Sequence, residues 1–207
     1  MTTEQLQPIN APTAVKIVDA AGHLFMQRGY KAVSITDIVK AAEVTKPTLY
    51  YYFADKEELF VQMGLRVMAE MGERMQAATA IPGSTAERLQ ALAAVLMADH
   101  DHDMRMMRHE MFEHLGPAQR ARLAQAFFLH LFAPVIRVME DGLGDGALAR
   151  YPARTLAKMF MGMAESFQEF TPRKGMGDKA QHETMFGPSD LTPSTLVDLF
   201  LNGVSSQ

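Results

Sequence analysis

The sequence contains no cysteine, and no segment shows the sustained apolar–polar alternation of a β-strand. The lack of cysteine excludes disulfides, thiolate–zinc sites and cysteine nucleophiles, so any metal would need histidine and carboxylate ligands. No apolar run approaches the roughly 20 residues of a membrane span, and the N-terminus lacks the basic-then-apolar order of a signal peptide. We therefore expect a cytoplasmic protein with no membrane partner.

The composition is that of a globular protein. The 207 residues are 48% hydrophobic and 21% charged, with a formal net charge of -4. This length suits one ordinary domain, or a small module joined to a larger one. The composition excludes intrinsic disorder and collagen-like repetition as descriptions of the whole chain.

Methionine, tyrosine and charge are distributed unevenly along the chain. Of the 17 methionines, 15 follow residue 60, whereas four of the five tyrosines lie between residues 30 and 52. Residues 12–56 carry six basic and four acidic side chains, a local charge of +2, and the rest of the chain carries -6. This division predicts two domains, residues 1–56 and residues 57–207.

Helical spacing of apolar residues recurs along most of the chain, so we expect an all-α fold. The first helix should cover residues 13–28, where Ile17, Ala21, Leu24 and Phe25 form one apolar stripe. Two short helices and one long helix should follow, with further helices over 85–98, 104–115, 117–142 with a kink at Pro134, 152–170 and 193–204. For residues 171–190 the alternatives are partial disorder, a functional flap or a loop with a short embedded helix.

Capping residues locate the two short helices and the long helix after them. Ser34 is placed as an N-cap, and Asp37 three residues later favours the positive end of the helix dipole. Thr45 should cap the second short helix, with Pro47 in its first turn, and Asp55 should cap the long helix over 56–80. Two short helices joined by a short turn and supported by a preceding helix form a helix-turn-helix, whose second helix fits the DNA major groove.

The second short helix carries three consecutive tyrosines. A run of tyrosines is unusual in a core, because each buried phenol hydroxyl needs a hydrogen-bond partner. Leu49 and Phe53, four residues apart, can pack the helix, which leaves tyrosines free to face phosphates. The alternative is that all three tyrosines cover the small core of the three-helix module.

The stretch GYKAVSITDIVKAAEVTKPTLYYYFADKEEL, residues 29–59, closely resembles the DNA-binding signature of the TetR (tetracycline repressor) family of transcriptional regulators. This resemblance implies an all-helical homodimer in which the first three helices bind DNA and the fourth links them to a ligand-binding core. It also implies that the last two long helices pair with those of the second subunit as a four-helix bundle.

The resemblance assigns DNA contacts to the start of the first short helix, to the second short helix and to the start of the long helix. The residues are Ser34, Thr36, Thr45, Lys46, Pro47, Thr48, Tyr50, Tyr52 and Lys56. Two positions depart from the family pattern. Glu43 replaces the usual turn glycine, so either a residue with a Cβ must accept that turn or the turn differs slightly, and Tyr52 stands where histidine is common.

The region after residue 60 is rich in methionine and phenylalanine, whose flexible and aromatic side chains could line a deformable apolar cavity. We expect ligand contacts there from Met68, Met71, Met75, Leu96, Met107, Met111, Phe112, Phe127, Phe128 and Leu131. The implied effector is small and hydrophobic or amphipathic. The alternative for each of these residues is an ordinary place in a helical core.

A histidine- and acid-rich stretch, Asp99–His114, is the candidate for an alternative function. Its histidines and carboxylates include His109 with Glu113, and Glu110 with His114, at helical i, i+4 spacing. The stretch matches neither zinc-protease motif. For H-E-x-x-H, His114 lies one residue too late, and for H-x-x-E-H, His109 lies one residue too early. A solvated polar turn between helices is the alternative to a metal site.

The sequence thus predicts a ligand-responsive DNA-binding regulator, with a repressor of a palindromic operator as the expected form. It predicts no catalytic residue, no resident metal and no cofactor. The alternatives are a helical metal-binding protein or metal-dependent enzyme using residues 99–114, and a helical interaction protein with a degenerate DNA module. The sequence identifies neither the effector nor the operator.

Overall fold

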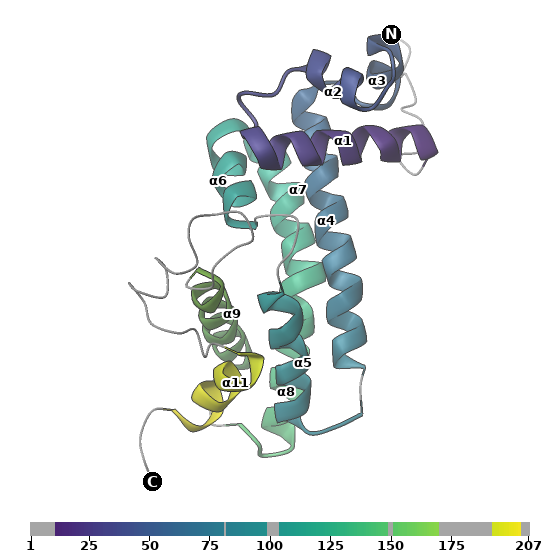
Figure 1. The fold of residues 1–207 in the computed structure, drawn as a ribbon. Helices are drawn as coiled ribbons and strands as arrows, with labels where there is room; N and C mark the ends of the chain where they lie inside the picture. Colours follow the sequence, from purple (N-terminus) through teal and green to yellow (C-terminus); the bar gives the residue numbers. More distant parts are fainter. Residues whose placement is uncertain (1–10, 81, 99–103, 149–150, 170–191, 204–207) are drawn as a thin grey trace. The chain divides into compact units, whose positions relative to one another are not determined.

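The computed structural model describes residues 11–80, 82–98, 104–148, 151–169 and 192–203. Within these ranges the structure contains helices and no strand, which confirms the all-α prediction (Figure 1). The predictions made for residues 171–190 and for Asp99 to Asp103 lie outside the described residues.

The observed helices begin and end close to their predicted residues. They are α1 Pro12–Arg28, α2 Ile35–Ala41, α3 Lys46–Tyr52, α4 Lys56–Thr79, α5 Thr85–Met97, α6 Met104–His114, α7 Pro117–Phe127, η1 Phe128–Phe132, α8 Ala133–Gly144, α9 Ala153–Glu169 and α11 Pro193–Asn202. Of these, η1 is a short π-helix that joins α7 to α8 without a loop.

The chain forms two compact units whose boundary differs from the predicted one at residue 56. Unit 1 comprises residues 1–69 and 100–127, and unit 2 comprises residues 70–99 and 128–207. The first unit therefore includes α6, α7 and the first half of α4 in addition to α1, α2 and α3. The physical reason is packing, because the backbone of α4 at Gly64 closely approaches Leu123 of α7 and Met107 of α6.

The core of unit 1 contains the apolar stripe expected on α1. Ile17, Ala21, Leu24 and Phe25 are all buried. The Phe25 ring meets the Phe60 ring of α4 edge-on, with centroids 5.4 Å apart. Burial of such aromatic rings contributes both apolar area and a specific geometry, so this cluster fixes α1 against the first half of α4.

Unit 2 is held by close packing among α5, α8, α9 and α11. The ring of Phe160 in α9 meets that of Phe200 in α11 edge-on, with centroids 5.3 Å apart. Gly142 lets the end of α8 approach α5 closely, because a Cβ built there would lie 2.6 Å from Cγ2 of Thr85. A glycine at this crossing is therefore a packing requirement.

A π-helical segment lies just before Pro134, the residue at which the sequence predicts a kink. Proline has no backbone N–H and cannot complete the usual bond to the carbonyl four residues earlier, which belongs to His130. The helix widens to i→i+5 bonding over Phe128–Phe132, ahead of the proline in the first turn of α8. The helix is therefore irregular next to Pro134, and the kink itself stays a prediction.

The stretch Pro117–Gly144 is long and apolar enough, by length and composition, to cross a membrane, contrary to the expectation from single apolar runs. Buried helices of a protein core pass the same test. Several apolar side chains of this stretch are buried, including Leu123, Leu131, Val135 and Met139. Burial of these side chains accounts for part of the hydropathy of the stretch.

Candidate nucleic-acid interface

The first helix of the candidate interface, α2, begins with a complete capping box. The Ser34 hydroxyl accepts a hydrogen bond from the Asp37 amide at 3.2 Å, and the Ser34 amide donates to the Asp37 carboxylate at 2.9 Å. The Ser34 hydroxyl also donates to the Asp37 carboxylate at 2.6 Å, and this bond, together with the one from the Ser34 amide, holds the pKa of Asp37 below its ordinary value. The predicted N-cap is confirmed, and α2 starts at a fixed residue.

The turn between α2 and α3 is a Schellman motif closed by a residue that is not glycine. The Val44 amide donates to the Val39 carbonyl at 3.0 Å, and the Glu43 amide donates to the Lys40 carbonyl at 3.3 Å. Glu43 has a φ of 51°, the one positive φ among the described residues other than glycine. The expectation that a residue with a Cβ occupies this turn is confirmed. Its carboxylate lies 2.8 Å from Nζ of Lys16.

Helix α3 is fixed at both ends by the residues expected from the sequence. The Thr45 hydroxyl accepts from the Thr48 amide at 3.3 Å, and Pro47 stands in the first turn. Leu49 and Phe53 are fully buried, which anchors one side of α3 against the module. The opposite side of the helix faces outward.

The outward side of α3 presents aromatic rings. Tyr50 is 49% exposed and Tyr51 is 54% exposed, whereas Tyr52 is half-buried. Since residues in a helix follow one another at about 100°, Pro47 and Tyr51 point most directly away from Leu49. The alternative that all three tyrosines cover the core is therefore wrong for Tyr50 and Tyr51. Tyr51 was not among the predicted contacts, although its position two residues after the core residue Leu49 could have identified it.

The side chains of the other predicted DNA contacts differ in their exposure to solvent. Ser34, Thr36, Thr45, Lys46 and Pro47 are exposed, whereas Thr48 and Lys56 are half-buried. The Thr48 and Thr45 hydroxyl oxygens lie 2.8 Å apart in a mutual hydrogen bond. The structure thus brings Thr45, Lys46, Pro47 and the exposed tyrosines together on one short helix.

Lys56 faces inward, and its predicted contact with the DNA backbone stays a prediction. Its ammonium donates to the carbonyls of Tyr30 and Val33, both at 2.8 Å. The same nitrogen lies 4.1 Å from the centre of the Tyr30 ring. Burial lowers the pKa of Lys56, although the Glu110 charge opposes this. Two of its three hydrogens are committed within the protein, so a phosphate would have only the third.

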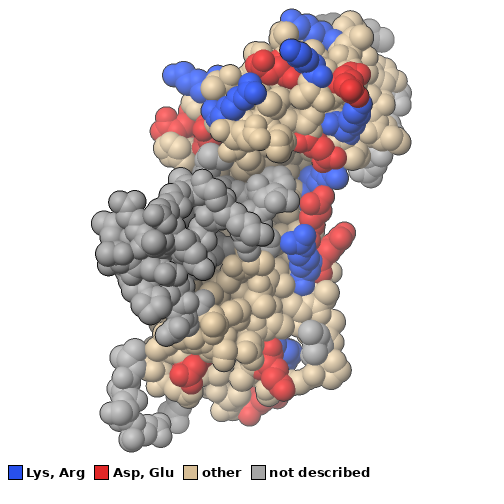
Figure 2. Space-filling model, viewed as in Figure 1, with Lys and Arg blue, Asp and Glu red and all other residues tan. Residues whose placement is uncertain are grey.

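Basic side chains surround this interface without dominating it. Arg28, Lys31, Lys40 and Lys46 are all exposed. Figure 2 shows Lys and Arg side chains over α1, α2 and α3 with acidic side chains among them. This mixture agrees with the modest local charge, and phosphate contacts by these cations would make binding weaken with salt.

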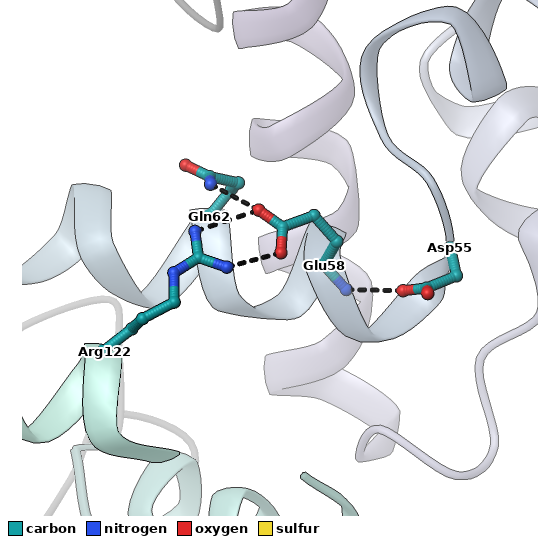
Figure 3. Close-up of polar contacts among 4 residues, drawn as sticks. All are labelled: Asp55, Glu58, Gln62 and Arg122. Carbon is teal, nitrogen blue, oxygen red and sulfur yellow. Dashed lines mark hydrogen bonds and ion pairs between the residues drawn. The ribbon is translucent and has the colours of Figure 1, made fainter. Parts of the chain in front are cut away.

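The start of α4, which directly follows α3, is anchored by a polar network (Figure 3). The Glu58 amide donates to Oδ1 of Asp55 at 2.7 Å, as expected for an N-cap. The Arg122 guanidinium of α7 donates to both carboxylate oxygens of Glu58, at 2.6 and 3.0 Å, and Gln62 donates to one of them at 2.6 Å. Burial alone would raise the pKa of Glu58, but the hydrogen bonds from Arg122 and Gln62 outweigh it and lower the pKa.

The residues expected to contact an effector fall in both units. Met68, Met107, Met111, Phe112 and Phe127 belong to unit 1, and Met71, Met75, Leu96, Phe128 and Leu131 belong to unit 2. Six are buried: Met68, Met71, Met75, Leu96, Met107 and Leu131. Phe112 is 60% exposed and lies beside the Arg120 guanidinium, so its ring is on the surface of its unit. Phe127 is also exposed.

The histidine- and acid-rich stretch is described from Met104 onward. Nε2 of His114 lies 3.2 Å from Oε2 of Glu110, as their i, i+4 spacing predicted. The His114 ring stacks on Tyr30, with centroids 5.1 Å apart. Among the described residues no group of three or more histidines and carboxylates is placed to hold a metal ion. The described part of the stretch, α6, therefore contacts the turn between α1 and α2 through His114.

Comparison with known proteins gives the same assignment for this module. Residues 17–63 match the family described as bacterial regulatory proteins, tetR family. The uncharacterized HTH-type transcriptional regulator YhgD of Bacillus subtilis is 28% identical over 133 residues, which are 64% of this chain and 70% of that protein.

Solved structures match over nearly the whole chain. The fatty acid degradation regulator FadR from Bacillus halodurans has a TM-score of 0.75 at 18% identity, covering 96% of this chain and 99% of its own. FadR from Bacillus subtilis, solved in complex with stearoyl-CoA, has a TM-score of 0.72 at 17% identity. The match covers 92% of this chain and 99% of that FadR chain. At these identities the similarity establishes the fold.

Proposed function

The chain belongs, through its N-terminal helices, to the tetR family of bacterial regulatory proteins, and on this premise we propose that it is a repressor released by a small effector. It is a DNA-binding transcriptional regulator, and the proposal concerns how it acts. The observation that carries the proposal is the exposed side of α3, where Pro47 and Tyr51 lie opposite the buried Leu49 and the exposed Lys46 stands in the first turn. This face combines a cation for phosphate with apolar and aromatic groups for base edges.

We propose that the protein binds DNA as a homodimer. A two-fold dimer presents two α3 helices, which read a palindromic operator when they stand about one helical turn apart, roughly 34–36 Å. Dimerisation also doubles the modest positive charge of the module. An effector that changes the separation of the two α3 helices would release the operator.

The proposed effector is hydrophobic or amphipathic. Buried methionine and leucine side chains of unit 2, Met71, Met75, Leu96 and Leu131, support this chemistry because thioethers adapt to irregular apolar shapes. FadR of Bacillus subtilis was solved with stearoyl-CoA, so a long-chain acyl-CoA is the first probe to test.

The experiment is operator selection followed by an affinity measurement. Random double-stranded DNA is enriched on the full-length protein, and fluorescence anisotropy then measures the Kd for the selected site and for a scrambled site. We expect a palindromic site, a dimeric stoichiometry and at least about 1000-fold preference over the scrambled site. Release on addition of stearoyl-CoA would support that effector class, while absence of any sequence preference would overturn the repressor.

A further inference from the structure

Tyr30 is the point where three helices of unit 1 meet. It lies in the turn between α1 and α2, four residues before the N-cap Ser34 of α2. Its ring is buried, and it contacts the Phe25 and Phe60 rings with centroids 5.5 and 5.2 Å away. Burial, with the nearby charges of Glu57 and Asp55, raises the pKa of Tyr30 to about 12, so the ring remains neutral. The position of this ring therefore sets where α2 begins.

The last turn of α6 contacts one side of the turn between α1 and α2, which contains Tyr30. The His114 ring stacks on Tyr30 with an interplanar angle of 23°, and Glu110 lies 3.2 Å from the same imidazole. Glu110 also lies against the backbone of Gly29, where a Cβ would come within 2.8 Å of its Oε1. Gly29 has φ 77° and ψ 157°, a conformation essentially restricted to glycine. The end of the Glu110 side chain thus occupies the space beside Gly29 in this turn.

The first turn of α4 holds the turn by a separate contact. The Lys56 ammonium lies over the Tyr30 ring and donates to the carbonyls of Tyr30 and Val33. The negative charge of Glu110 favours the protonated form of this ammonium. We name Tyr30, Lys56, Glu110 and His114 the Tyr30 clamp.

We propose that His114 and Glu110 are positioning residues for DNA binding, and that the clamp holds α2 and α3 in the arrangement that fits DNA. This inference rests on the proposed operator binding. Neither residue lies on α3, and both belong to the helix α6, which follows residue 100 in the chain. Displacement of the last turn of α6 would free the turn between α1 and α2 that contains Tyr30. The fraction of protein in the DNA-binding arrangement would then fall, and the apparent Kd for DNA would rise by the same factor.

The test compares full-length variants on one selected operator. His114→Ala and Glu110→Gln should weaken binding about tenfold, while the slope of log Kd against log salt stays unchanged because every phosphate contact is kept. The matched controls are His109→Ala and Glu113→Gln, exposed positions of the same two residue types on the same helix, which should stay within about twofold of wild type. Equal affinities for His114→Ala and His109→Ala would overturn the clamp.

A conservative pair separates positioning from simple unfolding. Tyr30→Phe and His114→Phe keep the stacked rings and should bind close to wild type, whereas Tyr30→Leu should bind as weakly as His114→Ala. Amide hydrogen exchange of the DNA-free protein gives a second readout. His114→Ala should speed exchange in residues 35–52 and His109→Ala should not. If His114→Ala leaves the exchange of residues 35–52 unchanged, the clamp is overturned, whether or not an operator is found. If the wild-type protein binds no DNA sequence specifically, only the proposed function is overturned.

Discussion

The guanidinium of Arg122 in α7 donates hydrogen bonds of 2.6 and 3.0 Å to the two carboxylate oxygens of Glu58 in the first turn of α4 (Figure 3). A bidentate contact of this kind fixes the orientation of the guanidinium and the carboxylate as well as the distance between them. Because α4 directly follows α3, the contact joins α7 to the DNA-binding module. It explains in part why α7 and the first half of α4 belong to the same compact unit.

Removing this contact should destabilise the protein. Arg122→Gln is expected to lower the free energy of unfolding by about 1 kcal/mol, a value that allows for solvent screening of the partly exposed guanidinium. Urea unfolding measures the change. Arg137→Gln, at an exposed position of α8, is the control and should have little effect. Equal stabilities for the two variants would show that the Arg122 contact contributes nothing.

The same contact makes stability depend on pH. The pKa of Glu58 is lower in the folded protein than in the unfolded chain, where it is about 4.3. Its stabilising effect is therefore complete above that value and is lost as the pH falls through the folded pKa. The difference in Tm between wild type and Arg122→Gln should shrink as the pH is lowered from 7 toward 3. A difference that stays constant over this range would contradict the assignment.

Glu43 should be replaceable by glycine with a gain in stability. Glycine adopts the positive φ of this Schellman turn without the penalty imposed by a Cβ. The loss of the exposed ion pair with Lys16 offsets the gain only slightly. We expect the Tm of Glu43→Gly to rise by about 2 °C, measured by calorimetry. Ala42→Gly, one residue earlier with an ordinary helical φ, should instead lower it.

Two glycines of α8 should respond oppositely to alanine. At Gly142 a Cβ would lie 2.6 Å from Thr85 Cγ2 and 2.9 Å from Leu148 Cδ1, so Gly142→Ala should destabilise by about 1–3 kcal/mol. At Gly144 nothing lies within 4 Å, so Gly144→Ala should stabilise the helix end by about 0.5 kcal/mol. Chemical denaturation of both variants compares them directly, and destabilisation of the two by equal amounts would contradict the described crossing of α5 and α8.

Local features of the fold could be predicted from the sequence because they depend on neighbouring residues. The caps Ser34, Thr45 and Asp55 each act within three residues, and they are found where expected. The unusual turn at Glu43 followed from its place in the motif. The core residues Leu49 and Phe53 followed from helical spacing, and both are buried.

Contacts between distant segments could not be predicted from the sequence. Nothing in the spacing of Lys56 indicates that its ammonium turns inward to the carbonyls of Tyr30 and Val33. His114 was expected in a polar stretch, but tertiary packing places its ring on Tyr30. The boundary of the units differed for the same reason, because α6 and α7 join the N-terminal module only in three dimensions.

The role of α3 in reading DNA is tested most directly by a salt titration of Lys46→Ala. Wild type should bind its selected operator with an affinity that falls steeply with salt. Lys46→Ala should bind more weakly, with a slope smaller by about one unit for each phosphate that the lysine neutralises. Lys158→Ala, at an exposed position of α9, should match wild type. Specific binding that Lys46→Ala leaves unchanged in both affinity and slope would contradict the assignment of α3 as the DNA-reading helix.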